Sequence, residues 1–191
     1  EALKKKYGKG QELRGKTLGI VGFGRIGQSV ASYALGCGMK VIAIDLYTNP
    51  VEIKVPIVGH GDVKVTITPK KDLSEVIGEL DYVSLHVPKQ PNGAAVIGEA
   101  EFSKLKKGVI LVNAARGGVI DENALLKALE SGHVRAVGLD VFENEPTPEV
   151  QILMHPKISL TPHIGAATLE AQDRIGTELA EQIISLLKLE K

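Results

Sequence analysis

The feature that most constrains the fold is a group of three glycines placed directly after a short apolar run. Gly22, Gly24 and Gly27 form a G-x-G-x-x-G pattern, which follows residues 18–21 and opens a stretch with helical apolar spacing at residues 26–35. In a strand–turn–helix unit, the first glycine permits a tight turn, the second lets the backbone approach a pyrophosphate, and the third lets the helix pack against the strand. The free N–H groups at the helix start favour phosphates. The pattern therefore predicts a βαβ unit that binds a dinucleotide.

The rest of the chain alternates between short apolar runs and amphipathic stretches. Strands are expected at residues 17–21, 40–44, 80–87, 109–112, 136–141 and 157–160, and helices at residues 26–35, 72–77, 122–129 and 169–189. Such alternation indicates βαβ units, which build a parallel sheet with helices on both faces. We therefore expect a Rossmann-type, doubly wound α/β fold in which residues 1–191 form a single domain.

Two segments depart from this alternation. Residues 47–69 contain Pro50, Pro56 and Pro69 together with alternating β-branched residues. These residue types argue against the crossover helix that a doubly wound fold normally places here. The first fourteen residues are basic and polar, and they predict a short helix followed by a linker.

The second expected strand ends in Asp45, which lies 23 residues after Gly22. A carboxylate at this spacing accepts hydrogen bonds from a ribose 2′-hydroxyl, and it would repel a 2′-phosphate. Residues 46–48 supply no arginine to bind such a phosphate. The sequence therefore favours NAD over NADP. A methyltransferase is an alternative interpretation of a glycine loop with an acidic strand end, although the spacing of the three glycines fits that class less well.

Composition argues against several other classes of protein. The chain has 23 basic and 23 acidic residues, and this balance gives no electrostatic signature of binding to nucleic acid or to an anionic membrane. No apolar run reaches the roughly 18 residues that cross a bilayer, and we expect no signal peptide. Cys37 is the only cysteine, which fits a reducing compartment. We therefore expect a cytoplasmic protein without a metal, nucleic-acid or membrane partner.

Three polar motifs follow the later strands, at the carboxyl ends that line the ligand crevice of an open parallel sheet. They contain Arg116, Glu145 and His163. Oxidation of an alcohol by NAD removes a hydride from carbon and a proton from oxygen, and histidine suits the proton because its ordinary pKa lies near working pH. A neighbouring carboxylate orients the imidazole, and a guanidinium binds a substrate carboxylate through two parallel hydrogen bonds. Each residue alone also fits a structural role, as a surface charge, a turn or a cap.

Taken in order, the motifs resemble those of the D-isomer-specific 2-hydroxyacid dehydrogenase family. The glycine pattern is followed by Asn-Ala-Ala-Arg-Gly-Gly from residue 113, Asp-Val-Phe-x-x-Glu-Pro from residue 140 and Thr-Pro-His-Ile-Gly from residue 161. The resemblance implies that Arg116 binds the carboxylate of a small 2-hydroxy acid, that Glu145 pairs with the histidine, and that His163 is the acid–base. Within the family, residues 163–172 look most like the members that oxidise a phosphorylated substrate, 3-phosphoglycerate.

The resemblance also implies a set of contacts with NAD. Arg25 and Ile26 would contact the pyrophosphate, and Asp45 the adenosine ribose. The expected cofactor-binding residues are Gly22, Gly24, Arg25, Ile26, Gly27, Asp45, His86, Val87, Pro88, Ala114, Ala115, Arg116, Asp140, His163, Gly165 and Ala166. Two departures from the family pattern affect this set. Residues 89–94 lack the threonine that the family usually has there, and Asn92 is a candidate replacement. The segment of residues 46–69 is longer than the corresponding segment of the family.

In this family the cofactor domain is inserted into a substrate domain. Only about fifteen residues precede the first expected strand, so we expect the substrate domain to be essentially absent from this chain. We then expect binding of NAD but poor turnover, because catalysis needs a closed cleft and a positioned substrate. Pairing through cofactor domains is common in the family and suggests a homodimer. Two alternatives stay open: a member acting on glyoxylate, hydroxypyruvate, glycerate or D-lactate, and an NAD-sensing module similar to a co-repressor.

Overall fold

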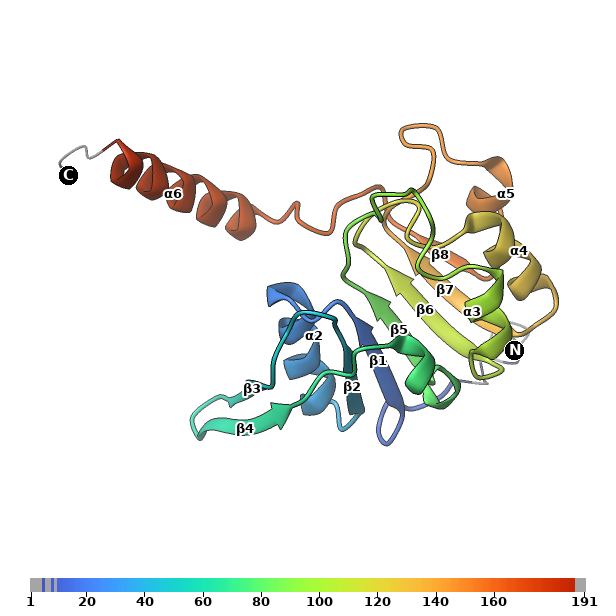
Figure 1. Cartoon of the computed structure of the whole chain (residues 1–191), viewed down its shortest axis with the longest axis horizontal. Helices are drawn as coiled ribbons and strands as arrows, with labels where there is room; N and C mark the ends of the chain where they lie inside the picture. The colour runs from blue at the N-terminus through green and yellow to red at the C-terminus, as the bar shows by residue number, and fades with distance from the viewer. Residues whose placement is uncertain (1–4, 6–7, 9, 188–191) are drawn as a thin grey trace.

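The computed structural model describes residue 5, residue 8 and residues 10–187, and it contains a central sheet of six parallel strands (Figure 1). Most of the helix predicted near the amino terminus therefore lies outside the described residues. The strands are β1 (Thr17–Val21), β2 (Lys40–Ile44), β5 (Tyr82–Leu85), β6 (Val109–Asn113), β7 (Val134–Leu139) and β8 (Ile158–Leu160). Their order in the sheet is β2-β1-β5-β6-β7-β8. The chain thus winds outward from β1 in both directions, which confirms the predicted doubly wound fold.

The helices agree with the sequence in part. They are α2 (Arg25–Gly36), α3 (Glu99–Lys104), α4 (Glu122–Glu130), α5 (Val150–Leu153) and α6 (Leu169–Leu186), with 3₁₀ turns η1 (Leu73–Glu75) and η2 (Ile77–Glu79). The helix predicted at residues 72–77 is wrong, because β-branched Val76 and Ile77 are followed by Gly78 and only two 3₁₀ turns form. Helices α3 and α5 were not predicted, since segments this short carry little periodicity.

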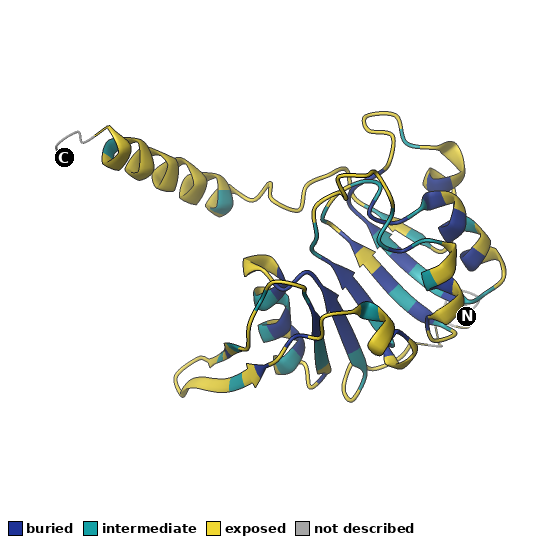
Figure 2. Ribbon diagram, in the orientation of Figure 1, coloured by how far each residue is buried: buried dark blue, intermediate teal, exposed yellow. Residues whose placement is uncertain are grey.

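The core divides into two clusters that lie on opposite faces of the sheet. Along β1, Leu18 and Ile20 belong to the cluster under α2, whereas Val21 belongs to the cluster shared with α4. Successive side chains of a strand point to opposite faces, so this division places α2 on one face and α4 on the other. Leu125 and Leu129 of α4 are fully buried, and the strands of the sheet are mostly buried or half-buried (Figure 2). Helix α6, in contrast, has no buried residue and extends away from the sheet.

An antiparallel hairpin occupies the place where a doubly wound fold normally has a crossover helix. Its strands are β3 (Val51–Ile57) and β4 (Gly61–Ile67). Ile53 is buried against the α2 cluster, and the hydroxyl of Ser32 in α2 donates a 2.7 Å hydrogen bond to the carbonyl of Lys54. The prediction that residues 47–69 do not form a helix is confirmed, and the hairpin covers α2 instead. No helix in the described part of the chain has the length and apolarity needed to cross a membrane.

Candidate active site

Each predicted site residue lies at, or just beyond, the carboxyl end of a strand or at the start of α2. The glycine loop between β1 and α2 follows the roles expected for it. Gly22 has a φ of 91°, and a Cβ there would lie 2.5 Å from the carbonyl oxygen of His86. A Cβ at Gly27 would overlap the carbonyl oxygen of Gly22. A Cβ at Gly24 would meet no atom within 4 Å, so this glycine leaves an open approach where the pyrophosphate of NAD is expected.

The carboxylate of Asp45 is held in place by backbone groups. Its oxygens accept hydrogen bonds from the N–H groups of Phe23, Tyr47 and Thr48 at 2.7, 2.8 and 2.8 Å. Partial burial raises the pKa of Asp45, but these hydrogen bonds outweigh it and hold the pKa below its usual value. The ionised carboxylate is thus fixed beside the glycine loop, as binding of a ribose hydroxyl requires.

Lys71 supports the same turn and was missed by the sequence reasoning. Its ammonium group donates hydrogen bonds to the carbonyls of Leu46 and Thr48 at 3.1 and 3.0 Å. Lys71 lies beyond the hairpin, 25 residues from Leu46, and no local pattern indicates this contact. The turn that follows Asp45 is therefore stabilised by a residue that follows the hairpin in the sequence.

His86 and Val87 lie against the glycine loop, next to Gly22. A Cβ at Gly22 would lie 2.8 Å from Cγ1 of Val87. The Nε2 atom of His86 lies 2.8 Å from the hydroxyl of Ser84, and burial lowers the pKa of His86. Pro88 follows at the exposed surface.

The central pair of the site is formed by His163 and Glu145. Nδ1 of His163 lies 2.8 Å from Oε2 of Glu145, and Oε1 of Glu145 accepts a 2.9 Å hydrogen bond from the N–H of Phe142. The hydrogen bond with His163 is the main cause that holds the pKa of Glu145 below its usual range, and the one from Phe142 adds to it. This geometry leaves Nε2 of His163 available to a ligand.

Asp140 fixes the segment that carries His163. Its carboxylate accepts hydrogen bonds from the hydroxyl of Thr161 at 2.6 Å and from the N–H groups of Ile164 and Gly165 at 2.8 Å each. Burial raises the pKa of Asp140, but these donors outweigh it and lower the pKa. His163 has a φ of 55°, which is uncommon for a residue with a side chain. Asp140 thus holds the backbone on both sides of His163, a residue in a costly conformation.

The loop with Arg116 lies beside these two segments. The side chain of Asn113 accepts from the N–H of Ala115 at 3.1 Å and donates to the carbonyl of Arg116 at 3.0 Å, which shapes the loop. A Cβ at Gly165 would lie 3.9 Å from that of Ala114. The guanidinium of Arg116 is exposed and donates to the carbonyl of Ala115; within the described residues it forms no ion pair. The structure places Arg116 on a neighbouring loop, and among the described residues no hydrogen bond or ion pair joins it to His163.

Three other predicted residues lie at the open surface. Arg25 and Ile26 begin α2, both exposed, and they line a hollow of about 450 Å³ together with residues of α6. Ala166 is exposed beside Gly165. Asn92, the candidate replacement for the missing threonine, accepts a 3.0 Å hydrogen bond from the N–H of Ala94 in its own turn, and its role toward the cofactor stays a prediction.

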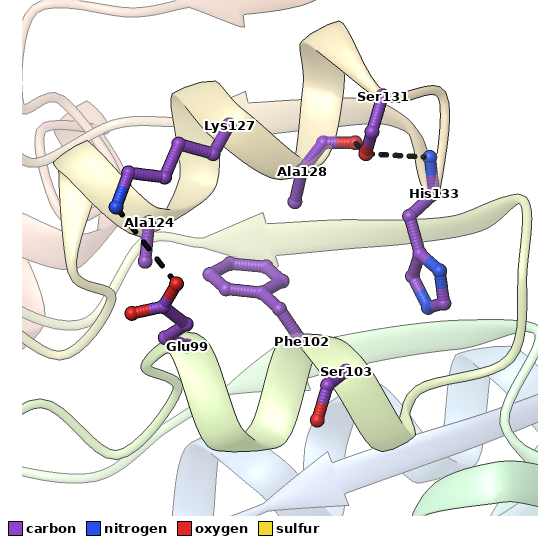
Figure 3. A pocket seen from close by; sticks show the side chains of 8 residues that line it. All are labelled: Glu99, Phe102, Ser103, Ala124, Lys127, Ala128, Ser131 and His133. Carbon is purple, nitrogen blue, oxygen red and sulfur yellow. Dashed lines mark hydrogen bonds and ion pairs between the residues drawn. The ribbon is translucent and has the colours of Figure 1, made fainter.

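Two cavities differ in whether predicted site residues line them. One of about 470 Å³ adjoins the acid–base pair, with Glu145 and His163 among its lining residues, alongside apolar groups such as Phe142 and Leu160. The other, of about 300 Å³, lies between α3 and α4 over the ring of Phe102 (Figure 3). None of the predicted site residues lines the second cavity, so the first is the candidate substrate pocket.

Comparison with known proteins shows similarity over most of the chain. A sequence model of the D-isomer specific 2-hydroxyacid dehydrogenase NAD-binding domain matches residues 2–165. The chain is 47% identical over 186 residues to a hydroxypyruvate reductase of Thermotoga maritima, covering 96% of the chain and 56% of that protein. It is 44% identical over 174 residues to a D-3-phosphoglycerate dehydrogenase of Mycobacterium leprae, covering 91% of the chain and 31% of that protein.

A solved structure shows the same fold. A glyoxylate reductase from Paecilomyes thermophila superposes with a TM-score of 0.75 at 38% identity, over 92% of this chain and 52% of that one. The chain thus spans between 31% and 56% of the length of these relatives. Given the match over residues 2–165, the chain belongs to the D-isomer specific 2-hydroxyacid dehydrogenase family, whose NAD-binding domain it carries.

Proposed function

We propose that the protein is a D-3-phosphoglycerate dehydrogenase, which oxidises 3-phosphoglycerate to 3-phosphohydroxypyruvate with NAD in serine biosynthesis. The observation that supports the chemistry is the contact of 2.8 Å between His163 and Glu145 at the carboxyl edge of the sheet. The choice of substrate is supported by the similarity to the Mycobacterium leprae enzyme. The proposal includes a homodimer in the cytoplasm.

The residues would divide the chemistry among them. Bound NAD would accept a hydride from the substrate carbon. Asp45 would hold the adenosine ribose, and Arg116 would bind the substrate carboxylate. Nε2 of His163 would take the hydroxyl proton, because Nδ1 already faces Glu145. The carboxylate of Glu145 would then stabilise the positive charge that the imidazole gains.

A second candidate is hydroxypyruvate reductase, which the 47% identity to the Thermotoga maritima protein favours. The two activities differ in whether the substrate carries a phosphate. They are separated by following NADH oxidation by the full-length protein with 3-phosphohydroxypyruvate, hydroxypyruvate, glyoxylate and pyruvate. We expect kcat/KM for 3-phosphohydroxypyruvate to be at least about tenfold higher than for each of the other three acids.

A higher kcat/KM for hydroxypyruvate would favour the second candidate instead. Binding of NADH without turnover of any of the four acids would favour an NAD-sensing module. The matched control is His163→Asn, which we expect to bind NADH normally in calorimetry while losing a factor of about 10² to 10⁴ in kcat.

A further inference from the structure

A reciprocal pair of hydrogen bonds joins the start of α4 to the loop after β7. The backbone N–H of Glu122 donates to Oε1 of Glu143 at 2.9 Å, and the N–H of Glu143 donates to Oε1 of Glu122 at 2.8 Å. Each glutamate thus binds the backbone of the other, across 21 residues of sequence. We call this pair the glutamate clasp.

The clasp is electrostatically costly. Glu122 is only 6% exposed, and its Oε2 atom has no hydrogen-bond partner in the described part of the protein. Burial raises the pKa of Glu122, and the charges of Glu143 and Glu149 raise it further. Burying a carboxylate with an unpaired oxygen beside another carboxylate costs more than an apolar contact of the same size. The clasp therefore contributes geometry rather than favourable charge.

The two segments that the clasp joins carry two of the site residues, Glu145 and Arg116. Glu143 is two residues before Glu145, whose carboxylate contacts His163. Arg116 lies six residues before Glu122, in the connection between β6 and α4. The backbones of these segments also touch, because a Cβ at Gly117 would overlap the carbonyl oxygen of Phe142. The clasp therefore adds a second point of contact between the same two segments.

We propose that Glu122 and Glu143 are positioning residues, which hold the loop of Glu145 at the place and angle that its contact with His163 requires. The proposal rests on the assignment of Glu145 and His163 as the acid–base pair. It adds that this pair depends on two glutamates that touch neither the substrate nor the cofactor. Substrate identity plays no part in it.

The test is to measure the pKa of Glu145 by carbon-13 NMR of its carboxyl group in the chain and in Glu143→Ala. The groups that face Glu145 are His163, which lowers its pKa, and Asp140, which raises it. Removal of a negative charge two residues away would by itself lower the pKa of Glu145. Loss of position would weaken the hydrogen bond to His163 and raise the pKa toward the ordinary value of about 4.3. The direction of the shift therefore separates the two effects.

We expect an upward shift in Glu143→Ala and a smaller or no upward shift in Glu143→Gln, because glutamine keeps an oxygen that accepts from Glu122. Glu122→Ala should reproduce the upward shift. The double alanine variant should add little, since both residues act through one clasp. Glu149→Ala is the matched control: Glu149 is exposed and accepts from Asn144 in the same loop, and its loss leaves the clasp intact.

A pKa of Glu145 that stays unchanged or falls in folded Glu143→Ala and Glu122→Ala would overturn the proposal. Thermal unfolding of the same samples shows that the variants are folded. A purely structural role would lower the melting temperature without raising the pKa of Glu145. The measurement needs no substrate, so failure of the proposed dehydrogenase activity would remain a separate result.

Discussion

Asp45, directly after β2, accepts a 2.7 Å hydrogen bond from the backbone N–H of Phe23 in the glycine loop. This bond fixes a carboxylate beside the place expected for the adenosine ribose. We expect Asp45→Ala to weaken NADH binding by about tenfold or more, since a hydrogen bond to a charged group contributes about 1.5–3 kcal/mol. Calorimetric titration with NADH and NADPH should also show that the preference for NADH is lost. Asp62→Ala, exposed on β4, is the control, and equal losses in both variants would contradict the prediction.

Two glycines of the same loop should separate binding from folding. Gly24→Ala places a methyl group in open space at an ordinary φ of −73°, so we expect an unchanged melting temperature and NADH affinity reduced by about tenfold or more. Gly22→Ala combines a φ of 91° with overlap of the His86 carbonyl, and we expect its melting temperature to fall by several degrees, about 1–2 kcal/mol arising from the strained φ alone. Normal NADH affinity in Gly24→Ala would argue against cofactor binding at this loop.

The carboxylate of Asp140 should make stability depend on acid pH. Its pKa in the folded protein is lowered, so its contribution is present above the ordinary value of about 3.9 and is lost as pH falls through the lower folded value. We expect Asp140→Asn to be about 2 kcal/mol less stable at pH 7, because an amide N–H₂ would face a backbone donor. Urea unfolding between pH 3 and pH 7 should show this difference shrinking at the acid end. A difference that is constant with pH would contradict the assignment.

Glu122 should show the opposite dependence on pH. Its folded pKa is raised, so the stability that its protonated form contributes is present below about 4.3 and is lost as pH rises through the folded value. Glutamine at this position carries no charge, so Glu122→Gln avoids the loss of stability above the folded pKa. Its side-chain oxygen can still accept from the N–H of Glu143. We expect the variant to be more stable than the parent chain at pH 7 and to lose that advantage below pH 4.3, as urea unfolding would measure. Glu99→Gln, on the exposed start of α3, should show no such gain.

Much of the fold could be predicted because its signals are local. The strands of the parallel sheet are short apolar runs, and the glycine loop is defined within six residues. The prolines and β-branched residues of residues 47–69 indicated that no helix forms there, and the structure shows the hairpin of β3 and β4. The two 3₁₀ turns η1 and η2 were predicted as a helix, because residues 72–77 have helical spacing but are too short to settle the geometry without their neighbours.

The sequence by itself determined which residue types stand at the carboxyl ends of the strands: Asp45, Arg116, Glu145 and His163 were each found from motifs. Only the tertiary structure decided how they are held. The support of Lys71 for the turn after Asp45, the bonds of Asp140 to Ile164 and the glutamate clasp of Glu122 each join segments 21 to 25 residues apart. Such contacts depend on the order of the strands in the sheet, which brings distant loops together and leaves no periodic trace in the sequence.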